Sequence, residues 1–384
     1  MKWYKQLESE NKLPIVIDKD KNYLPKLEFE LNNYLTKIGK MNCPSGLLCE
    51  LEGINKSILN SIKTYYSGDV ISSNKIILDL LVEFKSNPFL YSDLGSCHGF
   101  RGLAPLKKVE DDGDEIFRTK INLYKARVSA DGNQKFSISE MLHIPCDMRG
   151  LVRTQRFSIA GIPCMYFSTS SYGCWLELNK PQDELFNVSS YFLDDNLKVL
   201  NLVFNWKTIE EIASLDEREE DYKFDVEQMI SDLLKLWPLV CATSFRVDDN
   251  NRQFKSEYII SQHIMMSLKQ LEIDAVAYHS KRVEYALPNC INLAIPAFES
   301  NNRISKFCSN MKISEAVNFR EFKYLDASDK HTHKKSYINQ FNNYYNHVLL
   351  ANKSIRYETS VFGQFDNYLC SVPSSFPNVE DLNK

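Results

Sequence analysis

The residues from Arg153 to Glu177 combine side chains that can act together on a nucleotide. Arg156 can bind an anion, because a guanidinium offers paired donors to a phosphate. Tyr166 lies on the short β-prone run Cys164 to Ser168 and can stack on a flat ring. Glu177 can stabilise a developing positive charge. These are the groups needed to open the N-glycosidic bond of a nucleotide.

Each of these residue types also has an ordinary structural role. A glutamate such as Glu177, two positions from Trp175, is more often a surface carboxylate. A strand tyrosine such as Tyr166 is more often a core residue whose hydroxyl has a partner. A serine at a strand end, such as Ser280, more often completes main-chain hydrogen bonds. One such residue alone therefore does not identify a site. The prediction of a site depends on the order of all its residues along the chain, namely Arg127, Arg156, Tyr166, Glu177 and Ser280.

The composition excludes several classes of function. The 384 residues carry a net charge of −4 and contain no lysine- or arginine-rich tract, so we expect no nucleic-acid partner. No apolar run is long enough for a membrane span, and the polar start does not resemble a signal peptide. The ten cysteines form no C-x-x-C pair, which favours reduced thiols and a cytoplasmic protein. The spacings of Cys43, Cys49, Cys97 and His98, and of the pair His331 and His333, do not predict a metal site.

Hydrophobic periodicity predicts a helical N-terminal region followed by alternating strands and helices. Helices are expected at 23–38, 55–66, 74–84, 225–236, 256–271 and 337–350, with Pro238 ending the fourth. Strands are expected at 122–128, 164–168, 197–202, 274–280 and 290–296, with a β-like stretch at 319–325. Short links between these elements predict an α+β fold in which helices pack on mixed sheets.

Residues 118–298 resemble the RES domain family in the order and spacing of five segments. Tyr124-Lys125-Ala126-Arg127 matches a Tyr-Arg-Ala-Arg-like strand, and Gln155 to Gly161 matches a Gly-Arg-Phe-Asn-x-x-Gly-like segment. Tyr166 is followed eleven positions later by Glu177. A strand ending at Ser280 and a last strand containing Asn292 complete the set. The sequence departs from the family at Lys125, Gln155 and Ser158, which replace an arginine, a glycine and an asparagine.

The resemblance implies an ADP-ribosyltransferase-like fold and the cleavage of NAD by a bacterial toxin or defence effector. It assigns catalytic roles to Arg127, Tyr166, Glu177 and Ser280, and substrate binding to Arg156, Ser158 and Asn292. The arginines would hold the two phosphates and Tyr166 would stack on the nicotinamide riboside. Glu177 would stabilise the oxocarbenium-like ribose left by nicotinamide. NAD is the substrate in this scheme, and no cofactor or metal is required.

Three segments are expected: a helical region at 1–112, the NAD-cleaving domain at 113–300 and a C-terminal extension at 301–384. The acceptor of ADP-ribose stays open. Water or phosphate as the acceptor would make the protein a glycohydrolase or a phosphorylase. The first alternative is a mono-ADP-ribosyltransferase, which transfers ADP-ribose to a protein. A non-catalytic nucleotide-binding sensor is a second alternative. Family members imply an antitoxin or other regulatory protein as a partner, and a homo-oligomer is also left open.

Overall fold

The computed structural model of the chain describes residues 2–6, 13–108, 120–215, 219–249, 252–283, 287–298, 303–330, 334–340, 346–350 and 353–371. Its helices are α1 (Tyr23–Gly39), α2 (Ser45–Tyr66), α3 (Val70–Glu83), α4 (His98–Arg101), α6 (Ser171–Glu177), α7 (Trp206–Ser214), α8 (Val226–Ala242), α9 (Ile259–Leu271), α10 (Phe319–Tyr324), α11 (Ala327–Lys330), α12 (Tyr337–Gln340) and α13 (Val361–Ser371). Its strands are β1 (Ile15–Ile17), β2 (Tyr91–Asp93), β3 (Asn122–Val128), β4 (Cys164–Ser168), β5 (Phe186–Phe192), β6 (Lys198–Leu202), β7 (Phe245–Val247), β8 (Ala275–His279), β9 (Ile291–Pro296), β10 (Lys312–Ile313), β11 (Val317–Asn318), β12 (His347–Leu350) and β13 (Lys353–Arg356).

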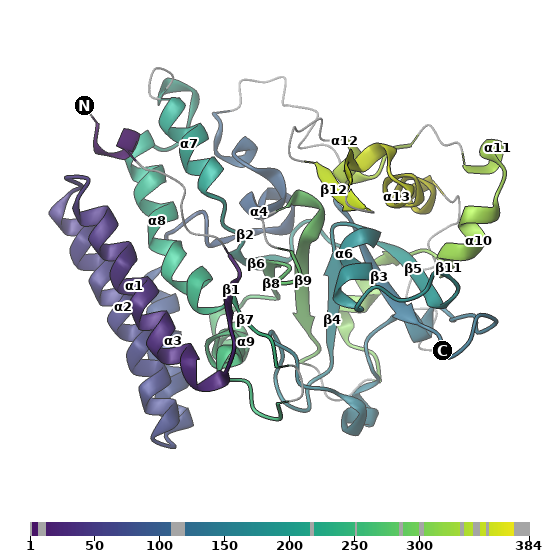
Figure 1. Cartoon of the computed structure of the whole chain (residues 1–384), viewed down its shortest axis with the longest axis horizontal. Coiled ribbons are helices and arrows are strands. Elements are labelled where there is room, and N and C mark those ends of the chain that lie inside the picture. The colour runs from purple at the N-terminus through teal and green to yellow at the C-terminus, as the bar shows by residue number, and fades with distance from the viewer. Residues whose placement is uncertain are drawn as a thin grey trace.

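In the part of the chain that the structure describes, a mixed sheet of nine strands lies at the centre (Figure 1). The strand order is β10-β5-β3-β4-β9-β8-β6-β2, and β11 also pairs with β5. Only β6 and β8 pair in parallel within this described sheet. β9 is buried along its whole length, as its nearly continuous apolar sequence indicates. Its residue Asn292 lies opposite Ser168 of β4 and Tyr278 of β8, which brings the ends of three strands together.

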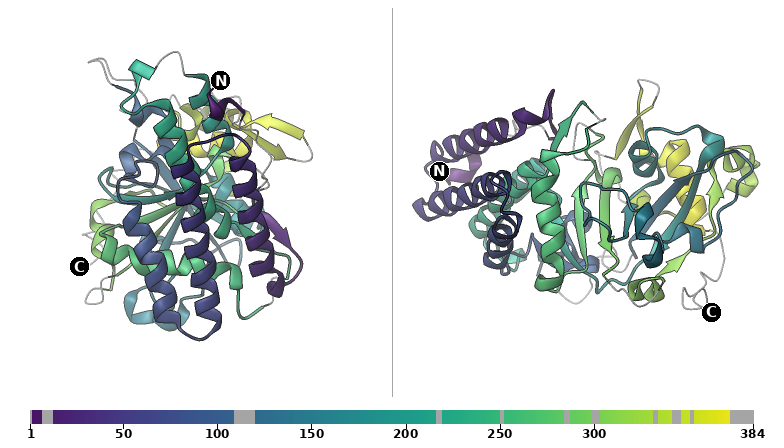
Figure 2. Two further views of the ribbon diagram at one scale, coloured as in Figure 1. Left: turned by 90° about the vertical axis from the view of Figure 1, so that its left-hand side faces the viewer. Right: turned by 90° about the horizontal axis from the view of Figure 1, so that it is seen from below.

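Helices α1, α2 and α3 form an outer layer, and α8 and α9 lie between this layer and the sheet (Figure 2). The apolar stripe of α1 is buried at Leu27, Leu31, Tyr34 and Ile38, at the spacing of one helix face. These side chains belong to the same hydrophobic core as α8, α9 and the neighbouring strands. The predicted α+β fold with a helical N-terminal region is therefore confirmed.

Helix α8 continues through Pro238 to Ala242, so the predicted helix end at Pro238 was wrong. Proline cannot donate a hydrogen bond to the carbonyl four residues earlier, here that of Leu234. The hydroxyl of Tyr34 donates to this carbonyl instead, at 2.8 Å. The Tyr34 ring also stacks on Trp237, with ring centroids 4.2 Å apart. A side chain from the N-terminal layer thus replaces the hydrogen bond that proline removes.

Two predictions near the C-terminus also needed correction. The stretch 319–325 is not β-like, because α10 places Phe319 and Phe322 on one buried helix face. Asn318 caps this helix, and its side-chain oxygen accepts the N–H groups of Arg320 and Glu321. The predicted helix 337–350 begins as α12 but ends as β12, which pairs with β13. Residues 341–345 of that prediction lie outside the described residues.

The C-terminal part lies at the opposite end of the sheet from α1–α3 (Figure 1). Its strands β10 and β11 pair with β5, and α10 and α13 share a core with α6. The predicted extension thus contributes to the same sheet as the predicted NAD-cleaving domain. The predicted boundaries near 112 and 300, most of the acidic run 107–115, and the pair His331 and His333 fall outside the described residues.

Candidate active site

Glu177 is the last residue of α6, a short helix held firmly at its start. The Ser170 hydroxyl caps the helix by accepting the N–H of Gly173 at 2.9 Å. A Cβ on Gly173 would lie 2.1 Å from Ser168 Oγ, so only glycine allows α6 to approach β4 this closely. The buried Asp366 of α13 also accepts the N–H of Ser171 at 3.1 Å. Both the sheet and the C-terminal helix therefore fix the position of α6.

The Glu177 carboxylate accepts two hydrogen bonds on one oxygen. Ser280 Oγ donates to Oε1 at 2.7 Å, and Asn292 Nδ2 donates to the same atom at 2.6 Å. Ser280 follows β8 and Asn292 lies on β9, so adjacent strands supply both donors. The other oxygen, Oε2, is 4.0 Å from Nε of Arg282. This arrangement leaves Oε2 for a ligand and holds the carboxylate in one orientation.

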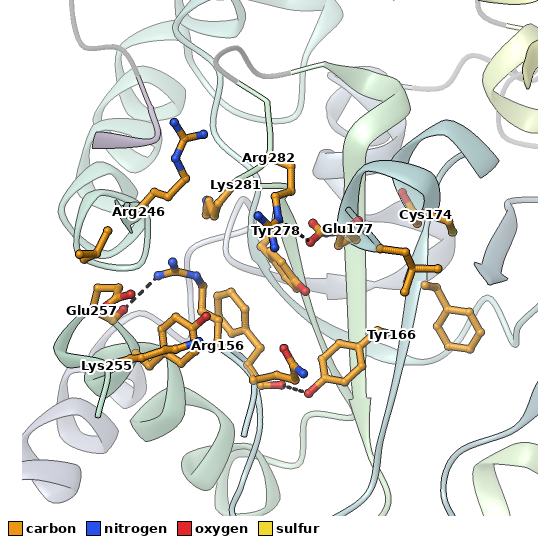
Figure 3. Close-up of a pocket in the computed structure, with 18 of the residues that line it drawn as sticks. Arg156, Tyr166, Cys174, Glu177, Arg246, Lys255, Glu257, Tyr278, Lys281 and Arg282 are labelled. Carbon is orange, nitrogen blue, oxygen red and sulfur yellow. Dashed lines mark hydrogen bonds and ion pairs between the residues drawn. The ribbon is translucent and has the colours of Figure 1, made fainter. Parts of the chain in front are cut away.

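Glu177 lines a cavity of about 310 Å³, which is within the size range of small-molecule sites (Figure 3). The cavity wall is strongly cationic. Its charged residues are Arg156, Arg246, Arg252, Lys255, Lys281 and Arg282, against the carboxylates Glu177 and Glu257. Aromatic side chains line it as well, namely Phe157, Tyr166, Phe167, Tyr258 and Tyr278. Cations and aromatic rings around a fixed carboxylate suit a ligand that combines phosphates with flat rings.

Arg156 lines the cavity, but its guanidinium is bound to the main chain. It donates to the carbonyls of Thr243, Glu257 and Phe245, and it lies over the ring of Tyr258, 4.7 Å from the ring centroid. These contacts join the segment before β4 to β7 and to the start of α9. The predicted phosphate-binding arginine therefore has a structural role in this conformation.

Tyr166 and Ser158 support the same segment. The Tyr166 hydroxyl donates to the carbonyl of Phe157 at 2.8 Å, and burial raises the pKa of Tyr166 well above its ordinary value. Tyr166 lines the same cavity as Glu177. Ser158 is buried, and its hydroxyl bonds the N–H and the carbonyl of Gln155 at 2.9 Å each. Ser158 does not line the cavity, so the structure places it in the supporting turn rather than at the ligand.

Arg127 does not join the other predicted residues. Its guanidinium donates to the carbonyl of Glu140 and lies over the ring of Phe136, 5.3 Å from the ring centroid. Successive side chains of a strand point to opposite faces, and Ala126 is the β3 residue that lines the cavity. Lys125, whose amine donates to the carbonyls of Met141 and Leu142, shares the face of Arg127. The predicted strand is present as β3, and the structure places Arg127 outside the cavity that the other predicted residues line or support.

Several cavity residues were not predicted from the sequence. Lys281 and Arg282 directly follow Ser280, at the end of a predicted buried strand. A pair of cations at such a position is a signal that the sequence offers, because strand ends are where polar side chains from different segments meet. Tyr278, on β8, packs its ring against Phe157 at a centroid distance of 4.2 Å. Arg246 and Lys255 lie in a polar stretch whose sequence gives no comparable signal.

The environment of the Lys281 amine strongly lowers its pKa. The amine donates to Ser244 Oγ at 2.6 Å, and no ion pair among the described residues includes it. Burial, followed by the nearby charge of Arg156, lowers the pKa of Lys281 to about 7, while Glu177 acts in the opposite direction. An anionic ligand beside an amine with such a low pKa favours its protonated, charged form.

No group of three or more His, Cys, Asp or Glu side chains that could hold a metal ion occurs in the ranges that the structure describes. A search of the same ranges found no helix with both the length and the apolar character needed to cross a bilayer.

Comparison with known proteins found one similar curated protein. The chain is 31% identical over 182 residues to a Bacillus subtilis (strain 168) protein named "Putative toxin YopC". The alignment covers 42% of this chain and spans 40% of the length of that protein. No protein-family model matches the chain, and no solved structure matches it.

Proposed function

We propose that this chain is a toxin that cleaves the N-glycosidic bond between nicotinamide and ribose in NAD. The observation that carries the proposal is the Glu177 carboxylate, held by Ser280 and Asn292 at the wall of a cationic, aromatic-lined cavity. NAD combines two phosphates, two ribose units and two flat rings, so its groups match those of the wall. The similarity to a protein named as a toxin supports the biological part of the proposal.

The carboxylate acts on charge that develops at the ribose. As the bond between C1′ and nitrogen breaks, its electron pair leaves with nicotinamide, which becomes neutral, and the ribose becomes an oxocarbenium-like cation. Glu177 stabilises this cation and can accept a hydrogen bond from a ribose hydroxyl through Oε2. Water then attacks C1′ and loses a proton, giving ADP-ribose. Phosphate attack instead would give the phosphorylated product, and both products remain part of the proposal.

The cavity groups have distinct tasks in this scheme. Ser280 and Asn292 keep the carboxylate in place, so it needs no reorientation during the reaction. The Tyr166 ring supports the nicotinamide riboside, because Tyr166 lines the cavity and its hydroxyl is already bound to the Phe157 carbonyl. An active enzyme of this kind depletes the NAD of the cell that makes it, so we also propose an inhibitory partner protein.

The first experiment is to incubate the purified chain with NAD, with and without phosphate, and to measure nicotinamide and the ADP-ribose product by chromatography. We expect turnover to fall at least a hundredfold in Glu177→Gln, because the amide cannot stabilise the cation. Glu52→Gln, an exposed change on α2, is the matched control and should leave turnover unchanged. Equal turnover in Glu177→Gln and the unmodified chain would refute the role of Glu177.

Transfer onto protein is tested in the same series. Labelled NAD is added with cell extract, and label retained on a protein would identify an ADP-ribosyltransferase instead. Binding of NAD without any release of nicotinamide, in buffer and in extract, would contradict the cleavage proposal and favour a nucleotide-binding sensor.

A further inference from the structure

The two arginines that the sequence suggested for phosphate binding are both committed elsewhere. Arg127 lies on the other face of β3, and the Arg156 guanidinium donates to three main-chain carbonyls. A third cavity arginine, Arg252, is paired with Asp20 and with both carboxylate oxygens of Glu257. Releasing Arg156 or Arg252 would leave partly buried polar groups without partners, which is costly. The positive charge for a substrate diphosphate must therefore come from other cavity residues.

The chemistry of NAD restricts where that charge can lie. The diphosphate is attached to C5′ of the same ribose whose C1′ reacts, so the nearer phosphate lies within one sugar of Glu177. Lys281 and Arg282 meet this requirement, because Arg282 Nε is 4.0 Å from Glu177 Oε2 and Lys281 is the adjacent residue. Arg246 and Lys255 lie farther from Glu177, across the cavity (Figure 3).

Both cations are available to a ligand. The Lys281 amine has a neutral partner, Ser244, and its charged or titratable neighbours are Arg156, Glu177 and the Cys241 thiol. Arg282 is 39% exposed and contacts Glu177 only at the outer limit of an ion pair. Its own N–H donates to Ser280 Oγ at 3.1 Å, which fixes the backbone next to the carboxylate. The segment that orients Glu177 therefore also presents two cations to the cavity.

We propose that Lys281 and Arg282 form the binding site for the substrate's diphosphate, in place of the arginines at 127 and 156. The inference rests on the proposed cleavage of NAD and identifies the part of the substrate that these residues recognise. Lys281 lies half-buried beside the ligand as a point charge, and Arg282 turns from Glu177 to a phosphate when the substrate enters. The exchange also frees Oε2 of Glu177 for the ribose.

The test is binding of ADP-ribose, measured by titration calorimetry with the full chain. ADP-ribose carries the same diphosphate, and its phosphates stay ionised over the pH range used. We expect Lys281→Met and Arg282→Gln each to weaken binding about tenfold or more, the effect of one lost hydrogen bond to a charged group. The matched controls Lys269→Met and Arg320→Gln remove the same charges from exposed positions and should leave the dissociation constant unchanged.

A second readout separates a direct role of Lys281 from a structural one. Because the pKa of Lys281 is about 7 in the free protein, a bound diphosphate should make the amine take up a proton above this pH. At pH 8 we expect proton uptake on binding, seen by calorimetry in buffers of different ionisation enthalpy. Lys281→Arg should bind without this uptake, since arginine is always charged.

The outcomes distinguish this inference from the proposed function. Dissociation constants within twofold of the unmodified chain in both Lys281→Met and Arg282→Gln would overturn the diphosphate site. So would the absence of ADP-ribose binding by the unmodified chain, even if NAD is cleaved and Glu177→Gln is inactive. If ADP-ribose binding depends on the two cations but NAD is not cleaved, the site stands and the proposed function falls. Arg282→Gln, at a half-exposed position, keeps the test valid if Lys281→Met does not fold.

Discussion

Glu177 depends on Ser280 and Asn292 for its orientation, and this dependence can be measured. Ser280→Ala removes one of the two hydrogen bonds on Oε1. A hydrogen bond to a charged group contributes about 1.5–3 kcal/mol, so we expect kcat for NAD cleavage to fall about tenfold to a hundredfold. KM should change little, because the serine does not bind the substrate in this scheme. Steady-state kinetics of the variant test this.

Asn292→Ala should behave in the same way, and the double variant should lose less than the product of the two effects, since both donors hold one atom. Ser67→Ala, an exposed change after α2, is the control and should not alter either constant. A rise in KM with unchanged kcat for Ser280→Ala would show that the serine binds substrate instead of positioning the carboxylate.

At this scale the sequence revealed part of the site. The resemblance to the RES domain family assigned Glu177, Ser280 and Asn292 to one site, and the structure brings the three side chains together. Alternation along a strand shows which residues share a face, but not which face meets the cavity, so the sequence could not show that Arg127 lies away from it. Lys281 was missed because its hydrogen bond to Ser244 joins two segments that are separated in sequence.

Helix α6 carries Glu177, and the buried Asp366 anchors the start of that helix. Asp366 accepts hydrogen bonds from the Ser171 N–H and, at 2.6 Å, from the Tyr357 hydroxyl. Burial raises the pKa of Asp366 to about 7, against an unfolded value near 4. The folded state therefore binds a proton more tightly, and this contribution to stability is complete below pH 4 and is lost as pH rises through 7.

Asp366→Asn should remove this dependence on pH. The amide keeps the shape of the protonated acid and cannot ionise, so the variant should gain stability relative to the unmodified chain as pH rises from 4 to 8. The expected gain is on the order of 3 kcal/mol. Urea unfolding at several pH values measures it. Parallel pH profiles for the two proteins would contradict the assignment, and Asp194→Asn, at a partly exposed turn, should give such parallel profiles.

Elements with strong periodicity were predictable from the sequence, and those that depend on distant partners were not. The stripe of α1 and the apolar runs of β8 and β9 correspond to observed elements. The β12–β13 hairpin was missed, because aromatic residues around 337–345 also suit a helix face. Proline in α8 was taken as a helix end because the Tyr34 hydroxyl that compensates it comes from a helix about 200 residues away.

The outer helices and the sheet form one structural unit. Tyr34 joins them, because its hydroxyl satisfies the Leu234 carbonyl that Pro238 leaves free. Tyr34→Phe keeps the stacking on Trp237 but leaves this buried carbonyl unpaired, so we expect it to cost about 1–3 kcal/mol of unfolding free energy. Chemical denaturation should show one shifted transition for the whole chain.

Tyr324→Phe removes a hydroxyl from a side chain that is 77% exposed, and it should leave the unfolding midpoint unchanged. A separate early transition in Tyr34→Phe, with the sheet unfolding at its usual midpoint, would show that the outer helices form an independent unit.

The anchoring of α6 by α13 has a consequence for how the protein is made. The ribosome releases the segments with Glu177, Ser280 and Asn292 before it releases Asp366. The nascent chain therefore already contains the groups that hold the Glu177 carboxylate, while the start of α6 still lacks its hydrogen bond to Asp366. The position of α6 is therefore fully fixed only after α13 has emerged. If the chain cleaves NAD as we propose, this activity begins only after translation has passed α13, which leaves time for the proposed inhibitory protein to bind.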